Sequence, residues 1–507
     1  MKGYICQQGL IVNERELKTR FGAKYNAFLN KLTLYYRPKV GPPKRVVLYK
    51  LNGGNLLLPR SLCYVLGGGN LGAVVHGNAA VGTPTAPTAP TARILDIEVA
   101  LPPITIIPAQ PLEIELYDNQ KIIVDYLMTV FTPDRIAAGT ACALLNLRAG
   151  FGKTFVAAGI IAALKLRTLY IVPKRPLMVQ AVKDLEVCFA GLKIGQFGTA
   201  KKNDPSKHDV TVIVIDSALL RDLEFFAGYS CVVFDEVHSY CSDKRKKIFK
   251  MAGSHVMLGM SATTEDRKDG FDAIAHKELA IGGVMHADTL PGFEYADIKF
   301  DTKVTVIRYN GPPEYTKSLT HESTGMQFTP YMNKQFLSDP HRNELALRSL
   351  RDLYDWTGPE GQKHCIYVFC EEVAPLGILY NAFHESFGDD VVAPECDVAK
   401  FVGGIKDAQI TAYKRDARIL LSTYGYAGTG VSIDKMTAIL FLTPRRANMK
   451  QILARILRGG GDRTITRRVV DIVDNKTSVK YQLGDRMCGY RYYEMDVDTV
   501  KVTAPTE

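Results

Sequence analysis

Short apolar runs alternate with longer, helix-like stretches from about Glu113 to the end of the chain. The first group of runs reads ALLNL, TLYIVP, VTVIVID, CVVFDE and HVMLGMSAT, and the second reads CIYVF, RILLSTY, AILFLTP and RVVDIVD. Continuous Val, Ile and Leu runs of this kind indicate strands that are buried on both faces. Strands that alternate with helical segments, such as residues 154–164, indicate parallel sheets. We therefore expect an α/β protein with two tandem parallel-sheet domains.

The residues before this pattern are expected to form a small N-terminal accessory region, residues 1–112. Within it, GGGNLG from Gly67 and the repeat TPTAPTAPTA cannot bury apolar area, which predicts a flexible surface insertion over about residues 67–92. Pro and Gly punctuation, including PGFEYAD and NGPPEY, predicts a connector between the two blocks. The expected divisions are 113–290 for the first α/β domain, 291–345 for the connector and 346–507 for the second α/β domain.

Composition fits a soluble globular protein. Of the 507 residues, 46% are apolar and 23% are charged, so several domains can each bury a core. No apolar run is long enough to span a membrane, and the first residues, MKGYICQQGLIVNERE, lack the apolar stretch of a signal peptide. The ten cysteines lack metal or redox spacing, which favours free thiols in a reducing compartment. We expect a cytoplasmic protein that is neither secreted nor membrane-bound.

Positive charge is concentrated in two stretches of the chain, whose net charge is +10. Residues 15–50 contain ten Lys or Arg against the single acid Glu16, with Phe and Tyr interleaved. Residues 445–468 contain eight basic residues against Asp462. Either stretch could bind a polyanion, although a charge run is more often a solvated face.

The sequence RAGFGKT, residues 148–154, follows the predicted strand ALLNL and opens a helix. Gly150 and Gly152 permit a tight turn whose backbone N–H groups surround phosphate oxygens at the positive end of the helix. Lys153 then reaches the β- and γ-phosphates, and Thr154 offers its hydroxyl to a magnesium ion. The predicted ATP loop comprises Ala149, Gly150, Phe151, Gly152, Lys153 and Thr154. Taken alone, a Gly-rich turn between a strand and a helix is often structural.

The run CVVFDEVH delivers two adjacent carboxylates at the C-terminal end of a predicted strand, where open α/β sheets bind their ligands. Asp235 is expected to hold the Mg²⁺ ion, and Glu236 to orient and deprotonate the attacking water. An Asp-Glu pair after a strand is common on protein surfaces. Its position after RAGFGKT, with a further α/β unit between them, favours the catalytic interpretation.

GMSAT ends the next predicted strand with small hydroxyl residues. Ser261, Ala262 and Thr263 suit short hydrogen bonds that can switch between sites. They are expected to couple the nucleotide to the rest of the protein.

QILARILR places three polar residues on one face of a predicted helix. Gln451, Arg455 and Arg458 follow i, i+4 and i+7 spacing. Two arginines on one face can neutralise the charge that develops on the γ-phosphate from across an interdomain cleft. By itself, this spacing is more often that of a solvated helix.

In this order, the motifs resemble those of superfamily 2 helicases of the DExH type, whose two RecA-like domains hydrolyse ATP between them. The resemblance covers about residues 113–475 and adds YDNQ, with Tyr117 and Gln120, IVPKRPLMVQ and STYGYAGTGVS to the motifs above. LSDPHRNELA, IYVF and LTPRRANMKQILARI more closely resemble the poxvirus-type transcript-release DNA helicase and related helicases of large cytoplasmic DNA viruses.

The resemblance implies a role for several further residues. Gln120 would lie on the adenine side, and Gly428 and Gly430 would bring backbone near both nucleotide and strand. His238 and Gln451 would couple the ATP state to motion of the second domain. The sequence departs from the family pattern at Leu147, Val237 and Ala454, none of which removes a side chain that the chemistry requires.

The resemblance also implies the partners and the place of action. An ATP- and Mg²⁺-dependent DNA helicase or translocase would bind single-stranded or duplex DNA and work with viral transcription machinery, in a viral factory or virion. An RNA helicase, or a nucleic-acid-stimulated ATPase that switches a transcription complex without separating strands, stays open, because single-strand backbones are gripped in similar ways.

Overall fold

A computed structural model describes most of the chain, in two compact units, Met1–Ala296 and Asp297–Glu507. The described residues are 2–36, 42–66, 96–148, 150–197, 204–264, 270–280, 283–295, 300–318, 329–386, 397–405, 407–427, 433–446, 448–458 and 462–505. The predicted insertion over residues 67–92 lies outside them. No helix among the described residues is long and apolar enough to cross a membrane.

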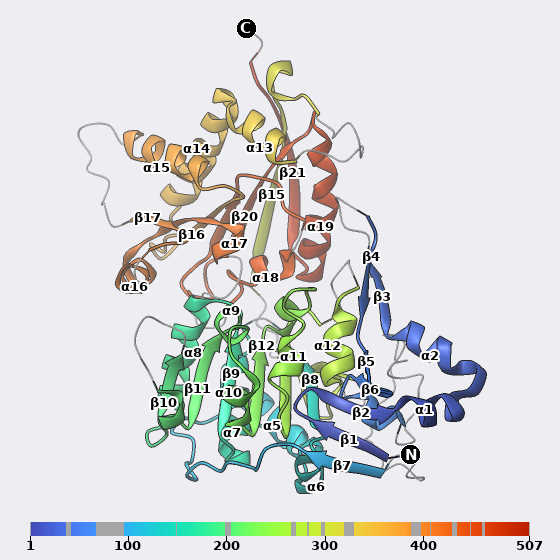
Figure 1. The fold of residues 1–507 in the computed structure, drawn as a ribbon. Coiled ribbons are helices and arrows are strands. Elements are labelled where there is room, and N and C mark those ends of the chain that lie inside the picture. The colour runs from blue at the N-terminus through green and yellow to red at the C-terminus, as the bar shows by residue number, and fades with distance from the viewer. Residues whose placement is uncertain are drawn as a thin grey trace. The chain divides into compact units, whose positions relative to one another are not determined.

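The first unit is built around a seven-stranded parallel sheet in the order β10-β11-β9-β12-β13-β8-β14 (Figure 1). Its strands are β8 (Ala141–Asn146), β9 (Thr168–Val172), β10 (Ile194–Phe197), β11 (Val210–Val214), β12 (Cys231–Asp235), β13 (Val256–Ser261) and β14 (Val284–His286). All residues of β9, β12 and β13 are buried, because both faces of the sheet are covered. The parallel sheet predicted for this part of the chain is confirmed.

Helices cover both faces of this sheet, which makes a three-layer α/β domain. One face packs against α5 (Asp118–Val130), α7 (Lys153–Leu164) and α8 (Arg175–Cys188). The other packs against α10 (Leu223–Ala227), α11 (Ile248–Met251), α12 (Asp272–Leu279) and the N-terminal region. Two shorter helices, α6 (Pro133–Ala137) and α9 (Ile215–Ala218), also belong to this domain.

The N-terminal region forms a mixed five-stranded sheet in the order β5-β6-β2-β1-β7. Its elements are β1 (Lys2–Cys6), β2 (Gly9–Asn13), α1 (Glu14–Phe21), α2 (Tyr25–Lys31), β5 (Lys50–Asn52), β6 (Asn55–Leu58), α3 (Leu62–Leu66) and β7 (Asp96–Ala100). Its apolar residues share one core with the first parallel sheet. Arg60, only 2% exposed, donates to the backbone carbonyls of Cys6 (2.7 Å) and Ser254. The region is therefore an integral layer of the first unit.

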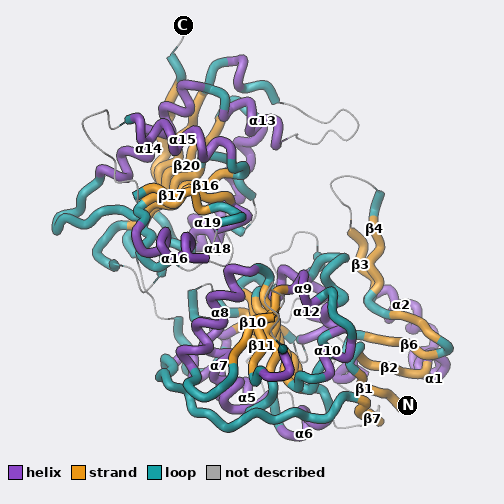
Figure 2. The backbone as a smooth tube through the Cα atoms, turned by 60° about the vertical axis from the view of Figure 1, so that its left-hand side comes forward, coloured by secondary structure: helices purple, strands orange, loops and turns teal. Residues whose placement is uncertain are grey.

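A two-stranded hairpin, β3 (Thr33–Tyr36) and β4 (Lys44–Val47), extends from the N-terminal region. In both views it runs away from the five-stranded sheet (Figures 1 and 2). At its base Leu32, Val46 and Leu48 join the shared core. Further along, Tyr35 is 71% exposed and lies opposite the exposed Arg45.

The second unit contains another seven-stranded parallel sheet, in the order β17-β18-β16-β19-β20-β15-β21. Its strands are β15 (Thr302–Asn310), β16 (Ile366–Cys370), β17 (Val398–Phe401), β18 (Ile419–Thr423), β19 (Ala438–Phe441), β20 (Arg467–Asp474) and β21 (Asp496–Thr503). One face packs against α13 (Thr329–Leu337), α14 (Pro340–Asp355) and α15 (Ala374–Glu385). The other packs against α16 (Asp407–Asp416), α17 (Tyr424–Ala427), α18 (Met449–Leu453) and α19 (Leu483–Tyr492). The predicted pair of tandem parallel-sheet domains is confirmed.

The predicted connector, residues 291–345, is wrong in one part, because residues 302–310 form the strand β15. β15 lies between β20 and β21 in the second sheet and pairs with β20 over eight residues. Its sequence, TKVTVIRYN, buries Val304, Val306 and Ile307. The Pro and Gly residues that suggested a connector flank the strand and do not interrupt it.

Candidate active site

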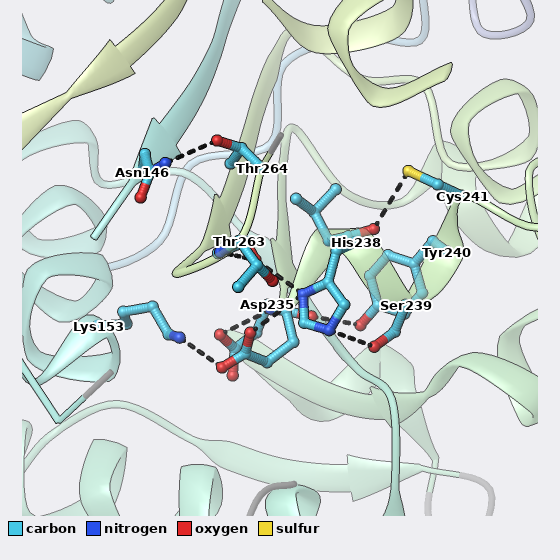
Figure 3. A network of polar contacts seen from close by, with 12 residues as sticks. Asn146, Lys153, Asp235, His238, Ser239, Tyr240, Cys241, Thr263 and Thr264 are labelled. Atoms are coloured by element: carbon cyan, nitrogen blue, oxygen red, sulfur yellow. Dashed lines mark hydrogen bonds and ion pairs between the residues drawn. The ribbon is translucent and has the colours of Figure 1, made fainter. Parts of the chain in front are cut away.

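Three neighbouring strands of the first unit end at the same edge of the sheet and carry the predicted motifs there. β12 lies beside β13, which lies beside β8. Asp235 ends β12, Ser261 ends β13, and the RAGFGKT loop follows β8. Because the strands are parallel, their carboxyl ends meet at one edge, where ligands of α/β sheets bind. Figure 3 shows the resulting cluster of polar side chains.

The glycines of the loop have backbone conformations that favour glycine. Gly150 has a φ of 83° and Gly152 a φ of 90°, a region that other residues enter at a steric cost. A Cβ atom on Gly152 would also lie 2.7 Å from Nε2 of Gln120. The loop ends at Lys153, where the twelve-residue α7 begins. Its first N–H groups and positive helix end are therefore available to an anion.

Lys153 and Glu236 form the central ion pair of the site. Nζ of Lys153 donates to Oε1 of Glu236. Glu236 has φ 49° and ψ 50°, a left-handed conformation that is uncommon for a residue other than glycine. The conformation turns the chain sharply after β12 into the short 3₁₀ helix Val237–Tyr240. The strained turn thus places the carboxylate of Glu236 against the lysine of the phosphate loop.

Asp235 is held deeper in the protein, with only 6% of its surface exposed. Burial raises the pKa of its carboxyl to about 7; Lys153 opposes this and Glu236 adds to it. The hydroxyl of Tyr240 lies 2.7 Å from the backbone oxygen of Asp235 and 2.9 Å from that of Ile171, and its single proton is shared between them. Tyr240 therefore ties the end of β12 to β9, a role that sequence patterns did not reveal.

His238 connects the end of β12 to the end of β13. Its Nδ1 lies 2.7 Å from Oγ of Ser261 and 3.4 Å from Oε2 of Glu236. Oγ of Ser261 in turn accepts from the backbone N–H of Thr263 at 3.0 Å. The structure thus joins the DEVH and SAT segments in one polar chain that reaches Glu236, while Ala262 is half-buried between its two hydroxyl neighbours.

The charges of the site fit a divalent cation. Two adjacent carboxylates, Asp235 and Glu236, face one lysine, so the cluster has an excess of negative charge. Asp235 and Thr154 both lie near the hydroxyl of Tyr170, whose pKa is raised well above its usual value by burial and then by the Asp235 carboxylate. One carboxylate and one hydroxyl, supplemented by phosphate oxygens, match the ligands that Mg²⁺ takes in nucleotide sites.

Gln120 lies beside the same loop and is 3% exposed. Its Oε1 accepts from the backbone N–H of Tyr117 at 3.1 Å, and its Nε2 donates to the backbone oxygen of Phe151 at 3.1 Å. Gln120 thus links the start of α5 to the phosphate loop. The side chain of Tyr117 is 79% exposed.

In the second unit, the predicted helical face over Gln451, Arg455 and Arg458 is only partly correct. α18 ends at Leu453, and the N–H groups of Arg455, Ile456 and Leu457 each bond to the carbonyl three residues earlier. The backbone therefore tightens after Gln451, and the i, i+7 relation of an α-helix does not extend to Arg458. Tight turns of this kind bring residues three apart to the same side.

The two arginines still lie near one another. Both act on the pKa of Tyr367, which burial raises and which Arg455 and Arg458 lower. Arg458 also lies 3.5 Å from Asp434. Gln451 and Arg455 are 6% and 7% exposed.

Three departures from the family motifs are apolar residues that the core accommodates. Leu147, Val237 and Ala454 are 0%, 1% and 7% exposed. Two predicted binding residues, Ala149 and Gly430, and the predicted Gly428 lie outside the described residues.

Sequence reasoning also missed a hydrogen bond next to the site. Nδ2 of Asn146, at the end of β8, donates to Oγ1 of Thr264 at 2.8 Å. Asn146 lies in the predicted strand ALLNL and Thr264 directly follows SAT, but their pairing depends on β8 lying beside β13, an order that the sequence pattern does not give.

A protein-family model described as "Type III restriction enzyme, res subunit" matches residues 113–266. The matched span runs from before α5 to just after β13 and so includes every site residue of the first unit.

Viral proteins are similar over most of the chain. A protein of African swine fever virus (isolate Pig/Kenya/KEN-50/1950), named "Putative ATP-dependent RNA helicase QP509L", is 29% identical over 502 residues, covering 96% of this chain and 90% of that protein. The "Transcript termination protein A18" of fowlpox virus (strain NVSL) is 21% identical over 382 residues, covering 72% of this chain and 77% of that protein.

A solved structure shares the fold. The "ATP-dependent Type ISP restriction-modification enzyme LlaBIII bound to DNA" has a TM-score of 0.51 and 14% identity, over 80% of this chain and 32% of that one. With the matching family model, the viral relatives and the order of the motifs, this likeness confirms the predicted resemblance. The chain thus resembles the superfamily 2 helicases, and its similarity to putative ATP-dependent helicases of large DNA viruses indicates an ATP-using enzyme.

Proposed function

We propose that this protein is an ATP-dependent DNA helicase or translocase that acts in viral transcription or DNA metabolism. The observation that carries the ATPase part is the pairing of Lys153 with Glu236 beside the buried Asp235, at the carboxyl edge of the first sheet. This arrangement supplies a phosphate-binding cation, a general base and a metal-binding carboxylate in one place.

Binding of ATP would change the partner of Lys153. Before nucleotide arrives, its ammonium group is neutralised by Glu236. A triphosphate carries more negative charge than one carboxylate, so the β- and γ-phosphates would draw Lys153 away, while the loop amides and the start of α7 hold the other oxygens. Asp235 and Thr154 would hold Mg²⁺, which neutralises phosphate charge when bound.

Hydrolysis would then use the carboxylate that Lys153 releases. Glu236, no longer paired with Lys153, can accept a proton from water as that water attacks the γ-phosphate and the bond to the β-phosphate oxygen breaks, which releases ADP. His238 lies 3.4 Å from Glu236 and bonds to Ser261, so a change at Glu236 is transmitted to the SAT segment. We propose that this chain of contacts couples the nucleotide state to movement along nucleic acid.

We propose that the nucleic acid on which the protein acts is DNA. DNA is supported by the description of the family model and by the DNA-bound restriction-modification enzyme. RNA is the second candidate, because the African swine fever virus relative is named an RNA helicase. The name of the fowlpox relative supports a role in transcription, which an ATPase that remodels a transcription complex without separating strands would also serve.

Two assays distinguish these functions. ATP turnover is measured without polymer and with single-stranded DNA, duplex DNA and RNA, and strand displacement is measured on matched DNA and RNA duplexes. We expect the strongest stimulation by DNA, together with displacement of a DNA strand. Displacement of RNA alone would establish the second candidate, and stimulation without displacement the third. An absence of ATP turnover under all four conditions would refute the proposal.

A further inference from the structure

The last described segment of the first unit packs against the phosphate loop. Residues 293–295 follow β14, and the unit ends at Ala296. The ring of Phe151, in the middle of RAGFGKT, lies 5.6 Å from the ring of Phe293 and 5.7 Å from that of Tyr295, centroid to centroid. Phe293 and Tyr295 are themselves 4.7 Å apart, edge to face. Three rings thus join the loop to the end of the unit.

Tyr295 also holds the first residue of the motif. The backbone N–H of Arg148 donates to the Tyr295 hydroxyl at 3.2 Å. The guanidinium carbon of Arg148 lies 4.1 Å from the centroid of the Tyr295 ring, within the range of a cation–π contact. One tyrosine therefore fixes both the backbone and the side chain of Arg148.

The segment is braced from its other side by α5. Nδ2 of Asn119 donates to the backbone oxygen of Glu294, and the Glu294 N–H donates to Oδ1 of Asn119 at 3.4 Å. The next residue, Gln120, bonds to the backbone oxygen of Phe151. Gln120 and Tyr295 therefore both hold the phosphate loop, and their neighbours Asn119 and Glu294 hold each other.

We propose that Tyr295 is a positioning residue for the phosphate loop, and that it makes ATP affinity depend on the conformation of the chain segment leading to the second unit. Tyr295 acts through Arg148 and Phe151 and not on ATP itself. The loop amides bind phosphate well only when the backbone is already in place, because ordering it on binding costs affinity. This inference rests on the proposed ATPase function.

Tyr295 lies next to the boundary between the two units, which is why ATP affinity would depend on the conformation of this segment. The second unit begins two residues later, at Asp297. Any movement that pulls on this segment must either carry Tyr295 with it or strain the ring cluster. Loss of the Tyr295 contacts would loosen the phosphate loop and lower its affinity for ATP. By linkage, ATP binding would in turn favour the conformation of the segment in which these contacts are made.

Tyr126 offers a matched control. Like Tyr295, it is half-buried and packs against the core on the α5, α7 and α8 face of the sheet. Its ring has no contact with the loop among those that the structure shows for the described residues. Tyr126→Ala therefore reproduces the loss of a partly buried ring without disturbing the loop.

The test measures nucleotide Kd by fluorescence of a labelled ATP analogue, together with KM and kcat for ATP with and without DNA, on the full chain. Tyr295→Ala is expected to raise Kd and KM about tenfold, with a smaller change in kcat and a lower ratio of DNA-stimulated to basal turnover. Tyr295→Phe keeps the ring but not the hydroxyl, and should restore most of the affinity. Tyr126→Ala should keep the parental Kd.

Parental Kd, KM and stimulation ratio in Tyr295→Ala would overturn the inference, as would an equal rise in Kd in Tyr126→Ala. If Tyr295→Ala does not fold, Tyr295→Leu, which keeps apolar volume without the ring, decides in its place. Lys153→Ala distinguishes failure of the proposed nucleotide site from failure of the positioning role of Tyr295. Retained ATP binding and turnover in that variant would refute the nucleotide site itself, whereas their loss beside an unaffected Tyr295→Ala refutes only the positioning role.

Discussion

Glu236 contacts both the lysine of the phosphate loop and a histidine that bonds to the SAT segment. Substitution of this one residue therefore tests both nucleotide binding and hydrolysis. Glu236 is ion-paired with Lys153 and lies beside His238, while its backbone is held in a left-handed conformation. Strain of this kind costs on the order of 1–3 kcal/mol and persists where the surrounding structure enforces it. The cost is understandable if the turn serves to present the carboxylate to the phosphate loop.

The Lys153–Glu236 pair predicts opposite effects of two substitutions on nucleotide binding. Lys153→Ala removes the phosphate-binding cation, so ATP affinity should fall and turnover should be lost. Glu236→Gln removes the carboxylate that pairs with Lys153, so affinity should be equal to or above that of the parent, while turnover falls by roughly 10²–10⁴-fold, as expected for loss of a positioned base. Equilibrium binding and steady-state ATPase assays measure both. Parental turnover in Glu236→Gln would show that another group is the base.

A second residue-scale prediction concerns Glu278 in α12, which is 4% exposed. Burial raises the pKa of its carboxyl to about 7, with Lys250 and Arg60 opposing. The folded chain therefore retains a proton that the unfolded chain releases near its ordinary pKa. The resulting stabilisation is complete below about pH 4 and is lost as pH rises through 7, an effect on the order of 3 kcal/mol.

Glu278→Gln should remove this pH dependence. Its unfolding free energy should match the parent near pH 5 and exceed it at pH 8, when both are measured by urea unfolding. The neighbouring Lys277, whose pKa burial lowers to about 8, changes stability only above this range, where stability rises with pH. Glu186→Gln, at an exposed position of α8, is the control and should follow the parent. A constant difference between Glu278→Gln and the parent across the range would contradict the argument.

At the scale of elements, burial determines which strands could be predicted. β9, β12, β13 and β16 are buried along their whole length, so their sequences are continuous apolar runs. β15 alternates with polar residues, as in Lys303 and Thr305, and Gly and Pro residues flank it. Its place in the sheet depends on pairing with β20, more than 150 residues later in the sequence, which no local pattern encodes.

The site was predictable where one short segment carries the chemistry. Lys153 and the Asp235-Glu236 pair stand in compact motifs beside apolar runs, and the structure brings them together. The links made by Tyr240 and Tyr295 were not predictable, because each depends on contacts between elements that are distant in sequence. The length of the helix at Gln451 was also beyond prediction, since helical spacing alone does not show where an α-helix tightens.

The β3–β4 hairpin leads to an element-scale prediction about nucleic-acid binding. Lys31, Tyr35 and Arg45 are exposed on or beside it, and cations with aromatic rings are the groups that hold a nucleic-acid backbone and its bases. We expect Arg45→Ala or Lys31→Ala to weaken DNA binding and to lower the slope of log affinity against log salt by about one unit each. Tyr35→Ala should weaken binding to single strands with little change in that slope.

Lys193→Ala is the matched control for this prediction, because Lys193 is exposed beside β10, at one edge of the parallel sheet. It should keep parental affinity and slope. Removal of residues 1–112 is a poor alternative, since it would take away apolar residues such as Ile5 and Leu10 that belong to the shared core. Unchanged affinity and slope in Arg45→Ala and Lys31→Ala would leave the hairpin as a solvated basic face.

At the scale of the whole molecule, the motif residues are divided between the two units. The first carries Lys153, Asp235 and Glu236, and the second carries Arg455 and Arg458. An enzyme divided in this way can make hydrolysis depend on domain movement, because chemistry then requires groups from both units. We expect the second unit to contribute cations to the reaction on ATP bound by the first.

Arg455→Ala and Arg458→Ala test this expectation. Negative charge spreads over the γ-phosphoryl oxygens in the transition state, so a cation supplied only at that stage accelerates hydrolysis more than it strengthens binding. Each substitution should lower DNA-stimulated kcat by up to about 10³-fold, while the Kd for ATP changes far less. Arg446→Ala is the control, because Arg446 is exposed and lies 3.9 Å from Asp485; it should alter polymer binding or nothing. Asp434→Asn removes the ionic partner of Arg458. It should preserve turnover if Arg458 acts on phosphate. A loss of turnover equal to that of Arg458→Ala would mean that the pair matters only for the structure of the second unit.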